Sequence, residues 1–151
     1  QNLLRRPPTR RLPTTRPTDP MQSADAAEAE FYAAFAATDV PRMRAVWADS
    51  PDCLCVHPAG LPIAGYAAVM ASWQDILGSA SPIDLHCERV ARLVGDDTVV
   101  STVYEHFVPP GTDGELAPVL ATNIYRRVDG QWKIVVHHAS PVVVRPPAAP
   151  P

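Results

Sequence analysis

The pattern of hydrophobic and polar positions changes at Pro82. Before Pro82, apolar residues recur mostly at intervals of three and four, the spacing of helices that bury one face. After Pro82 the interval becomes two, which is typical of strands. Helices followed by consecutive strands predict an α+β fold.

Three helices are predicted in the first part of the chain. The first extends from a Ser23 N-cap to about Thr38, the second carries Pro41 in its first turn, and the third lies between Gly65 and Gly78. The apolar positions of these helices should form the helical side of the core: Ala27, Phe31, Ala34, Phe35, Met43, Val46, Trp47, Val69, Met70, Trp73, Ile76 and Leu77.

A short strand is predicted at 53–57, between the second and third helices, and a turn rich in proline and glycine follows it. Four longer strands are predicted after the third helix, at 83–94, 98–108, 116–128 and 132–144. Because they follow one another directly, we expect these four strands to form an antiparallel meander.

Asp129-Gly130 is a strong signal for a two-residue hairpin turn between the last two strands. Such a turn would make two cross-strand pairs, Arg127 with Trp132 and Tyr125 with Ile134. Continuing the same register puts Asn123 and His138 on one face, which we expect to be the inner face. A single β-bulge would put His137 there instead.

Proline and charge are concentrated differently in the tails and in the middle of the chain. Of the 18 prolines among 151 residues, ten lie in 1–22 and 141–151. Residues 1–22 carry five arginines and one aspartate, whereas 23–140 carry seven basic and fifteen acidic groups. We expect a disordered Pro/Arg-rich tail at 1–22, one folded domain at 23–140, and a strand end with a Pro/Ala-rich tail at 141–151. Because the composition changes at Met21, we expect Met21 to be the natural start.

These numbers also exclude several classes of partner. The acidic domain disfavours nucleic acid, because phosphate contacts need clustered Lys and Arg. No apolar run approaches the roughly 18 residues of a transmembrane helix, and no apolar segment follows the N-terminal arginines. We therefore expect a cytoplasmic protein that does not contact membranes. Cys53, Cys55 and Cys87 lack metal-ligand spacing and are expected to be buried free thiols.

Three segments together resemble the nuclear transport factor 2-like superfamily: EFYAAFAATDVPRMRAVWA, CLCVHPAGLPIAGYAAVMASW and ATNIYRRVDGQWKIVVHHAS. The resemblance covers residues 30–140 and is strongest to the SnoaL-like and ketosteroid-isomerase-like branch. It implies a cone in which a curved antiparallel sheet wraps around the three helices. It further implies a pocket for a small apolar molecule and a homodimer formed through the outer face of the sheet.

The resemblance also implies two catalytic residues. In ketosteroid isomerases the general-base aspartate precedes a Pro-x-Gly turn, and His57-Pro58-Ala59-Gly60 matches that position. An imidazole is suited to proton transfer near neutral pH. Asn123 falls where those enzymes carry an acidic donor to the oxyanion, and a carboxamide can also donate there. The family's oxyanion tyrosine aligns with Phe31, which cannot donate, so steroid isomerisation itself is not expected.

Further candidates for lining the pocket are aromatic or histidine side chains of the helices and strands: Trp47, Tyr66, Trp73, Tyr104, His106, Tyr125 and His138. Aromatic residues at helical spacing are also common in cores, His57 could simply order its turn, and Asn123 could be a buried structural amide. The histidines are scattered over several strands, so we expect neither a metal nor a cofactor.

Three functions are compatible with these residues. The first is an isomerase or cyclase that moves a proton on an apolar carbonyl compound. The second is a dehydratase that uses histidine, tyrosine and asparagine in the pocket. The third is a non-catalytic ligand-binding or homo-oligomeric assembly domain. A catalytic cone requires His57 and Asn123 on one cavity, whereas a cone filled by Phe31, Trp47 and Trp73 favours assembly.

Overall fold

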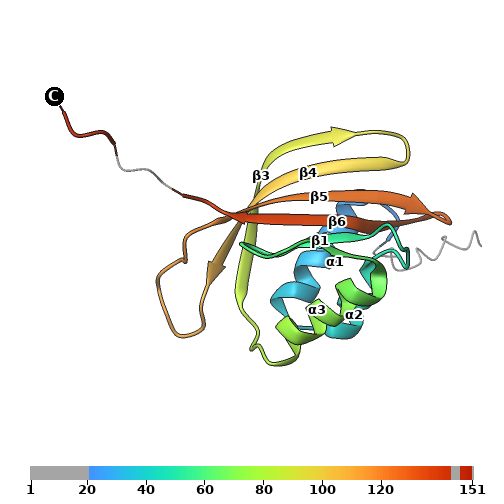
Figure 1. The fold of residues 1–151 in the computed structure, drawn as a ribbon, viewed down its shortest axis with the longest axis horizontal. Coiled ribbons are helices and arrows are strands. Elements are labelled where there is room, and N and C mark those ends of the chain that lie inside the picture. Colours follow the sequence, from blue (N-terminus) through green and yellow to red (C-terminus); the bar gives the residue numbers. More distant parts are fainter. Residues whose placement is uncertain (1–20, 144–146, 151) are drawn as a thin grey trace, which may run out of the picture.

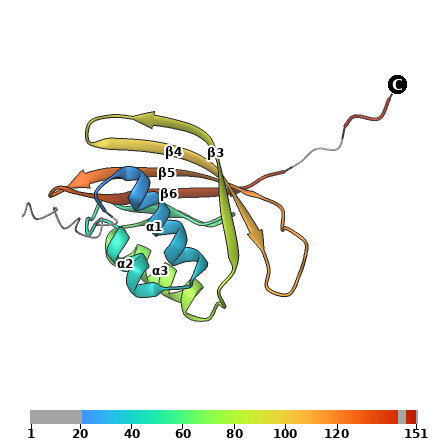
Figure 2. The same ribbon diagram turned by 180° about the vertical axis from the view of Figure 1, so that it is seen from behind.

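Three helices lie on one side of a strongly bent sheet in the computed structural model, which describes residues 21–143 and 147–150 (Figures 1 and 2). The helices are α1 (Ala24–Ala36), α2 (Val40–Val46) and α3 (Tyr66–Gly78). The strands are β1 (Leu54–Val56), β2 (Ile63–Ala64), β3 (Asp84–Val94), β4 (Thr98–Val108), β5 (Val119–Val128) and β6 (Gln131–Pro141). They form one six-stranded sheet in the order β2-β1-β6-β5-β4-β3, which confirms the predicted α+β class.

The predicted helix starts are confirmed by their capping hydrogen bonds. The Ser23 side chain accepts a hydrogen bond from the Ala26 N–H at 3.0 Å, and Asp39 accepts one from the Arg42 N–H at 3.0 Å. Each cap satisfies a backbone donor that the first helical turn leaves without a partner. The sequence therefore determines where α1 and α2 begin.

The sheet is mixed rather than wholly antiparallel. Strands β3 to β6 form the predicted antiparallel meander. Strand β1 joins its edge in parallel with β6, so that Cys55 lies opposite His137. The two-residue strand β2, which the sequence did not predict, pairs with β1. The parallel pairing brings the His57 end of β1 beside the middle of β6.

A β-bulge in β6 decides which histidine faces the helices. Asp129 and Gly130 both have positive φ, 50° and 77°, as the predicted two-residue turn requires. Tyr125 then pairs with Ile134 as predicted, but Ile124 pairs with Val136, which leaves Val135 as an extra residue. The inner position opposite Asn123 is therefore occupied by His137, and the expectation that His138 faces inward is wrong. His137 is buried, whereas His138 is exposed.

Strand β4 also presents the opposite face from the one expected. Its buried positions alternate through Val99, Ser101, Val103 and Glu105. Tyr104 and His106, which we expected to face inward, therefore lie on the outer face of the sheet. Each face of β4 carries both apolar and polar side chains, so the pattern alone could not choose between them.

The ends of two strands differ from the prediction because of proline. Strand β5 begins at Val119 rather than at 116, directly after Pro118, and β6 ends at Pro141 rather than at 144. Proline has no N–H to donate to a ladder. The expectations for the tails at residues 1–20, 144–146 and 151 lie outside the described residues.

All three cysteines are free thiols, with Cys53 and Cys55 buried as expected and Cys87 exposed against expectation. Among the described residues, no helix has both the length and the apolar composition needed to cross a bilayer.

Aromatic side chains fill the space between the helices and the sheet. Phe31, Trp47 and Trp73 are at most 2% exposed. The Phe31 ring lies edge-on to both indoles, with centroid distances of 6.3 Å to Trp47 and 5.6 Å to Trp73. Edge-to-face packing adds to the free energy gained by burying large rings. These three side chains therefore form the centre of the core.

We expect Trp73→Ala to lower the free energy of unfolding by about 3–5 kcal/mol, because it leaves a large cavity beside Phe31. Ile76→Ala on the same helix is the control, since Ile76 is 39% exposed and should cost less than about 1 kcal/mol. Urea unfolding followed by far-UV circular dichroism measures both. Equal losses in the two variants would contradict the assignment of Trp73 to the core.

Candidate functional site

A row of small and polar side chains crosses the inner face of the sheet. Ser101 of β4 lies opposite Asn123 of β5, Asn123 lies opposite His137 of β6, and His137 lies opposite Cys55 of β1. All four are buried. Buried polar groups are stable only where they are hydrogen-bonded, so the partners of this row determine what it can do.

Four side chains form a continuous hydrogen-bonded chain, which we call the interior relay: Glu105, Tyr32, Asn123 and His137. The Tyr32 hydroxyl donates to Glu105 Oε2 at 2.8 Å. It accepts from Asn123 Nδ2 at 2.7 Å. The Asn123 Oδ1 lies 2.6 Å from Nδ1 of His137. The relay thus joins helix α1 to three strands.

The proton positions in the relay follow from these contacts. An amide oxygen can only accept, so His137 Nδ1 carries the hydrogen and donates to Asn123. Burial lowers the pKa of His137 to about 3, and repulsion from His57 and His138 adds to the effect. His137 is therefore neutral at pH 7, and every hydrogen bond of the relay points toward the Glu105 carboxylate.

Glu105 is the acidic end of the relay. Burial raises its pKa to about 7, although the hydrogen bond from Tyr32 acts in the opposite direction. A carboxyl group with this pKa can both give and take a proton near neutral pH. It is the one group of the relay whose charge changes in that range.

His57 directly follows the last residue of β1 and is only partly buried. Its ring is edge-on to Trp73, with a centroid distance of 4.9 Å. The Ser72 hydroxyl donates to the Val69 carbonyl at 2.7 Å, so it accepts from His57 Nε2, which lies 3.0 Å away. The lone pair of His57 is therefore on Nδ1. Burial lowers the pKa of His57, which favours a neutral imidazole able to take up a proton.

The structure brings some of the predicted site residues together and separates others. His57, Trp73 and Asn123 are connected through His137, whose ring centroid lies 5.8 Å from that of Trp73. Tyr125 and Trp47 are core residues. Tyr104, His106 and His138 are on the outer face, and Tyr66 donates to the Arg44 carbonyl beside α2.

Two clefts lie on the surface rather than in the cone. One is lined by residues before β1 and by the start of α3: Asp49, Ser50, Pro51, Ala64, Gly65, Tyr66, Ala67 and Ala68. The other lies between α2 and the β5–β6 hairpin: Arg44, Ala45, Trp47, Ala48, Asp49, Tyr66, Val128, Asp129, Gln131 and Lys133. Neither is bordered by His57 or Asn123.

Sequence reasoning missed the roles of Tyr32, Glu105 and His137. Tyr32 follows Phe31, the residue that aligns with the family's tyrosine, and its hydroxyl reaches both β4 and β5. The sequence held one indication of the role of Glu105. If the face of the strand that carries Glu105 points inward, this carboxylate requires a buried hydrogen-bond donor. The inward position of His137 could be predicted only if the bulge at Val135 were known.

The chain belongs to the SnoaL-like domain family, whose model matches residues 25–144. This confirms the resemblance inferred from the three sequence segments.

Solved structures similar to this fold include two with sequence identities of 37% and 29%. One is a Thiobacillus denitrificans protein that carries the provisional name of a calcium/calmodulin-dependent protein kinase type II association domain. It is 37% identical with a TM-score of 0.78, and the match covers 82% of this chain and 98% of that one. The other is a provisionally named dehydratase of the NTF2-like family from Streptomyces avermitilis. It is 29% identical with a TM-score of 0.68, and the match covers 80% and 94% of the two chains.

A curated relative is the F-box protein SKIP8 of Arabidopsis thaliana, which is 26% identical over 115 residues. The match covers 76% of this chain and 48% of that protein, so the chain spans about half the length of this relative.

Glu105→Gln should change how stability depends on pH. The folded Glu105 has a pKa of about 7 against an ordinary value of 4.5, so the folded state binds the extra proton between these values. The contribution of Glu105 to stability therefore falls by about 3 kcal/mol as the pH rises through this window. Glutamine still accepts from Tyr32 but does not titrate, so this decrease should be absent in the variant.

Urea unfolding at a series of pH values from 4 to about 8.5 measures the difference between wild type and variant. Asp96→Asn, at an exposed turn position, is the control and should keep the wild-type profile. An unchanged profile in Glu105→Gln would contradict the raised pKa.

Proposed function

We propose that this domain is a homo-oligomeric association module that forms a dimer through the outer face of its sheet. The observation that carries the proposal is an apolar row across four neighbouring strands. Leu93 lies opposite Val100, Val100 opposite Ile124, and Ile124 opposite Val136. Leu93 is 71% exposed, so part of the row is open to solvent in the single chain.

On one side, the adjacent rows of β4 to β6 extend this surface without adding charge, although Glu88 of β3 lies opposite Tyr104. On the other side, Arg126 and Lys133 bound the surface. The next row contains Thr102, Thr122 and His138, and the row after it contains Tyr104, Leu120 and Ser140. A surface of apolar and uncharged polar side chains can be desolvated at low cost. A two-fold axis through such a surface pairs the same face of both copies, as most homodimers do.

The interior supports the same proposal. Phe31, Trp47 and Trp73 fill the cone, which is the arrangement expected for assembly rather than for a ligand cavity. Both ends of the Asn123 amide are already engaged, by Tyr32 and by His137. The Thiobacillus denitrificans protein, 37% identical, is named for association, which adds support from outside the chain.

Ile124→Lys tests the proposal, because it places a charge in the middle of the apolar row. We expect the wild type to be a dimer and the variant to dissociate at least about ten times more readily, since an unpaired charge would be buried. Sedimentation velocity over a concentration series measures the dissociation constant.

Leu61→Lys is the matched control, because Leu61 is 83% exposed in the turn between β1 and β2. The control should keep the mass of the wild type. A monomeric wild type, or a dimer that Ile124→Lys leaves intact, would overturn the proposal.

A second candidate function is proton transfer on a small apolar carbonyl compound at the His57 end of the cone. It is favoured by one observation: His57 presents an unprotonated Nδ1 while Ser72 fixes its other nitrogen. The dehydratase name of the 29% identical Streptomyces avermitilis protein is compatible with such chemistry. In this proposal His57 is the base, and Asn123 would donate to the oxyanion only after giving up one of its present partners.

Exchange of the α-hydrogens of cyclohexanone in D₂O, followed by proton NMR, tests this second function. Wild type should accelerate the exchange, and His57→Ala should reduce the rate by about 100-fold or more, the usual contribution of a general base. His138→Ala controls for exposed imidazoles. Exchange that is absent in the wild type, or equal in His57→Ala, would rule the base assignment out.

A further inference from the structure

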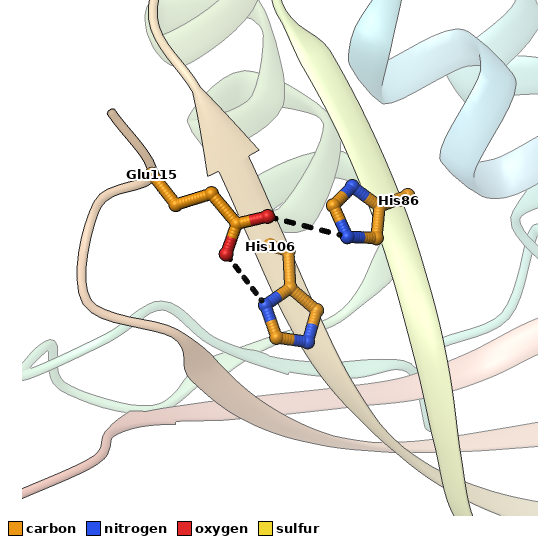
Figure 3. A group of neighbouring side chains, drawn as sticks. All are labelled: His86, His106 and Glu115. Carbon is orange, nitrogen blue, oxygen red and sulfur yellow. Dashed lines mark ion pairs between the residues drawn. The ribbon is translucent and has the colours of Figure 1, made fainter. Parts of the chain in front are cut away.

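We propose that His86, His106 and Glu115 form a binding site for a divalent transition-metal ion of the Zn²⁺ type on the outer side of the sheet. His86 and His106 lie directly opposite each other on β3 and β4. Glu115 belongs to the loop between β4 and β5, and the Leu116 N–H anchors this loop by donating to the Phe107 carbonyl at 2.9 Å. Figure 3 shows the carboxylate of Glu115 turned toward both imidazoles.

The separations between the three side chains are those of ligands around one ion. Glu115 Oε1 lies 3.5 Å from His86 Nε2, and Glu115 Oε2 lies 3.4 Å from His106 Nδ1. The three ligand atoms lie within 4.8 Å of one another. These separations are long for hydrogen bonds. Two ligands bound to a tetrahedral Zn²⁺ at the usual bond lengths are about 3.3–3.5 Å apart.

His106 provides an independent observation. Its Nδ1 is buried and has no hydrogen-bond partner. Its Nε2 lies 3.4 Å from Oε2 of Glu88. A hydrogen on Nε2 would be directed at Glu88 and would leave a lone pair on Nδ1 facing Glu115. A cation between Nδ1 and Glu115 satisfies both groups, and a carboxylate behind the ligating histidine is the usual second shell of a zinc site.

The chemistry of the set selects the class of ion. Two imidazoles and one carboxylate suit Zn²⁺ and neighbouring transition metals, whereas Mg²⁺ and Ca²⁺ prefer oxygen ligands throughout. The two rings are stacked at 4.8 Å with an angle of 9° between their planes, so binding requires a ring rotation. The side chain of His86 is 56% exposed, which leaves it free to turn.

A metal at this place would tie the loop at 109–118 to the ends of β3 and β4. The loop has few other attachments to the sheet among the described contacts, and it contains Gly111 at a φ of 75°. Three protein ligands leave a fourth coordination position open. The sequence alone did not indicate a metal, because the register that places His86 opposite His106 cannot be derived from it.

The purified chain, freed of metal by a chelator and without a histidine tag, is titrated with Zn²⁺ by calorimetry. We expect one ion per chain. Co²⁺ should give the visible absorption of a tetrahedral site without a sulfur-to-cobalt band, which separates this site from Cys53, Cys55 and Cys87. Absence of Zn²⁺ binding would overturn the proposal.

Matched variants assign the ligands. His86→Ala, His106→Ala and Glu115→Gln should each weaken Zn²⁺ binding by more than about 10-fold, the lower limit seen even for loss of a second-shell partner. Asp113→Asn removes one carboxylate from the same loop and should bind like the wild type. Circular dichroism verifies that each variant is folded. The Co²⁺ spectrum is recorded on the wild type, so it tests the site even if a variant does not fold. Equal binding by Glu115→Gln and Asp113→Asn would overturn the site.

Discussion

The Tyr32 hydroxyl is the contact on which the interior of this domain depends. It donates to the Glu105 carboxylate and accepts from the Asn123 amide, so a single oxygen joins helix α1 to strands β4 and β5. A carboxylate that is 1% exposed is costly unless a donor faces it. The position of α1 over the sheet therefore follows as much from this polar contact as from the apolar side chains around it.

The relay connects the polar groups on the inner face of the sheet to one another. Each of its hydrogen bonds is made between protein groups, and the aromatic rings of Phe31, Trp47 and Trp73 occupy the neighbouring space. The groups that we propose to contact other molecules lie instead outside this relay. They are the outer face of the sheet, the His57 end of β1, and the His86–His106–Glu115 cluster.

Much of the fold could be predicted from periodicity and caps, because both are local properties of the chain. Ser23 caps the first helix and Pro41 lies in the first turn of the second, as expected. Asp129-Gly130 makes the expected hairpin with Tyr125 opposite Ile134. The candidate site was predicted less completely. Asn123 and Trp73 face the interior, but His138, Tyr104 and His106 do not, because the period of two identifies a strand without identifying its inner face.

The sequence by itself determined the α+β class, the family and the order of the elements. Local hydrogen bonds, backbone preferences and apolar spacing are sufficient for the class and the order of the elements, whereas the family follows from the resemblance of three sequence segments. Only the tertiary structure decided that Val135 is an extra residue in β6, that His137 rather than His138 meets Asn123, and that Glu105 lies within reach of Tyr32. The physical reason is that contacts between distant segments set a bulge and a cross-strand register. A shift of one residue moves every following side chain of the strand to the opposite face of the sheet.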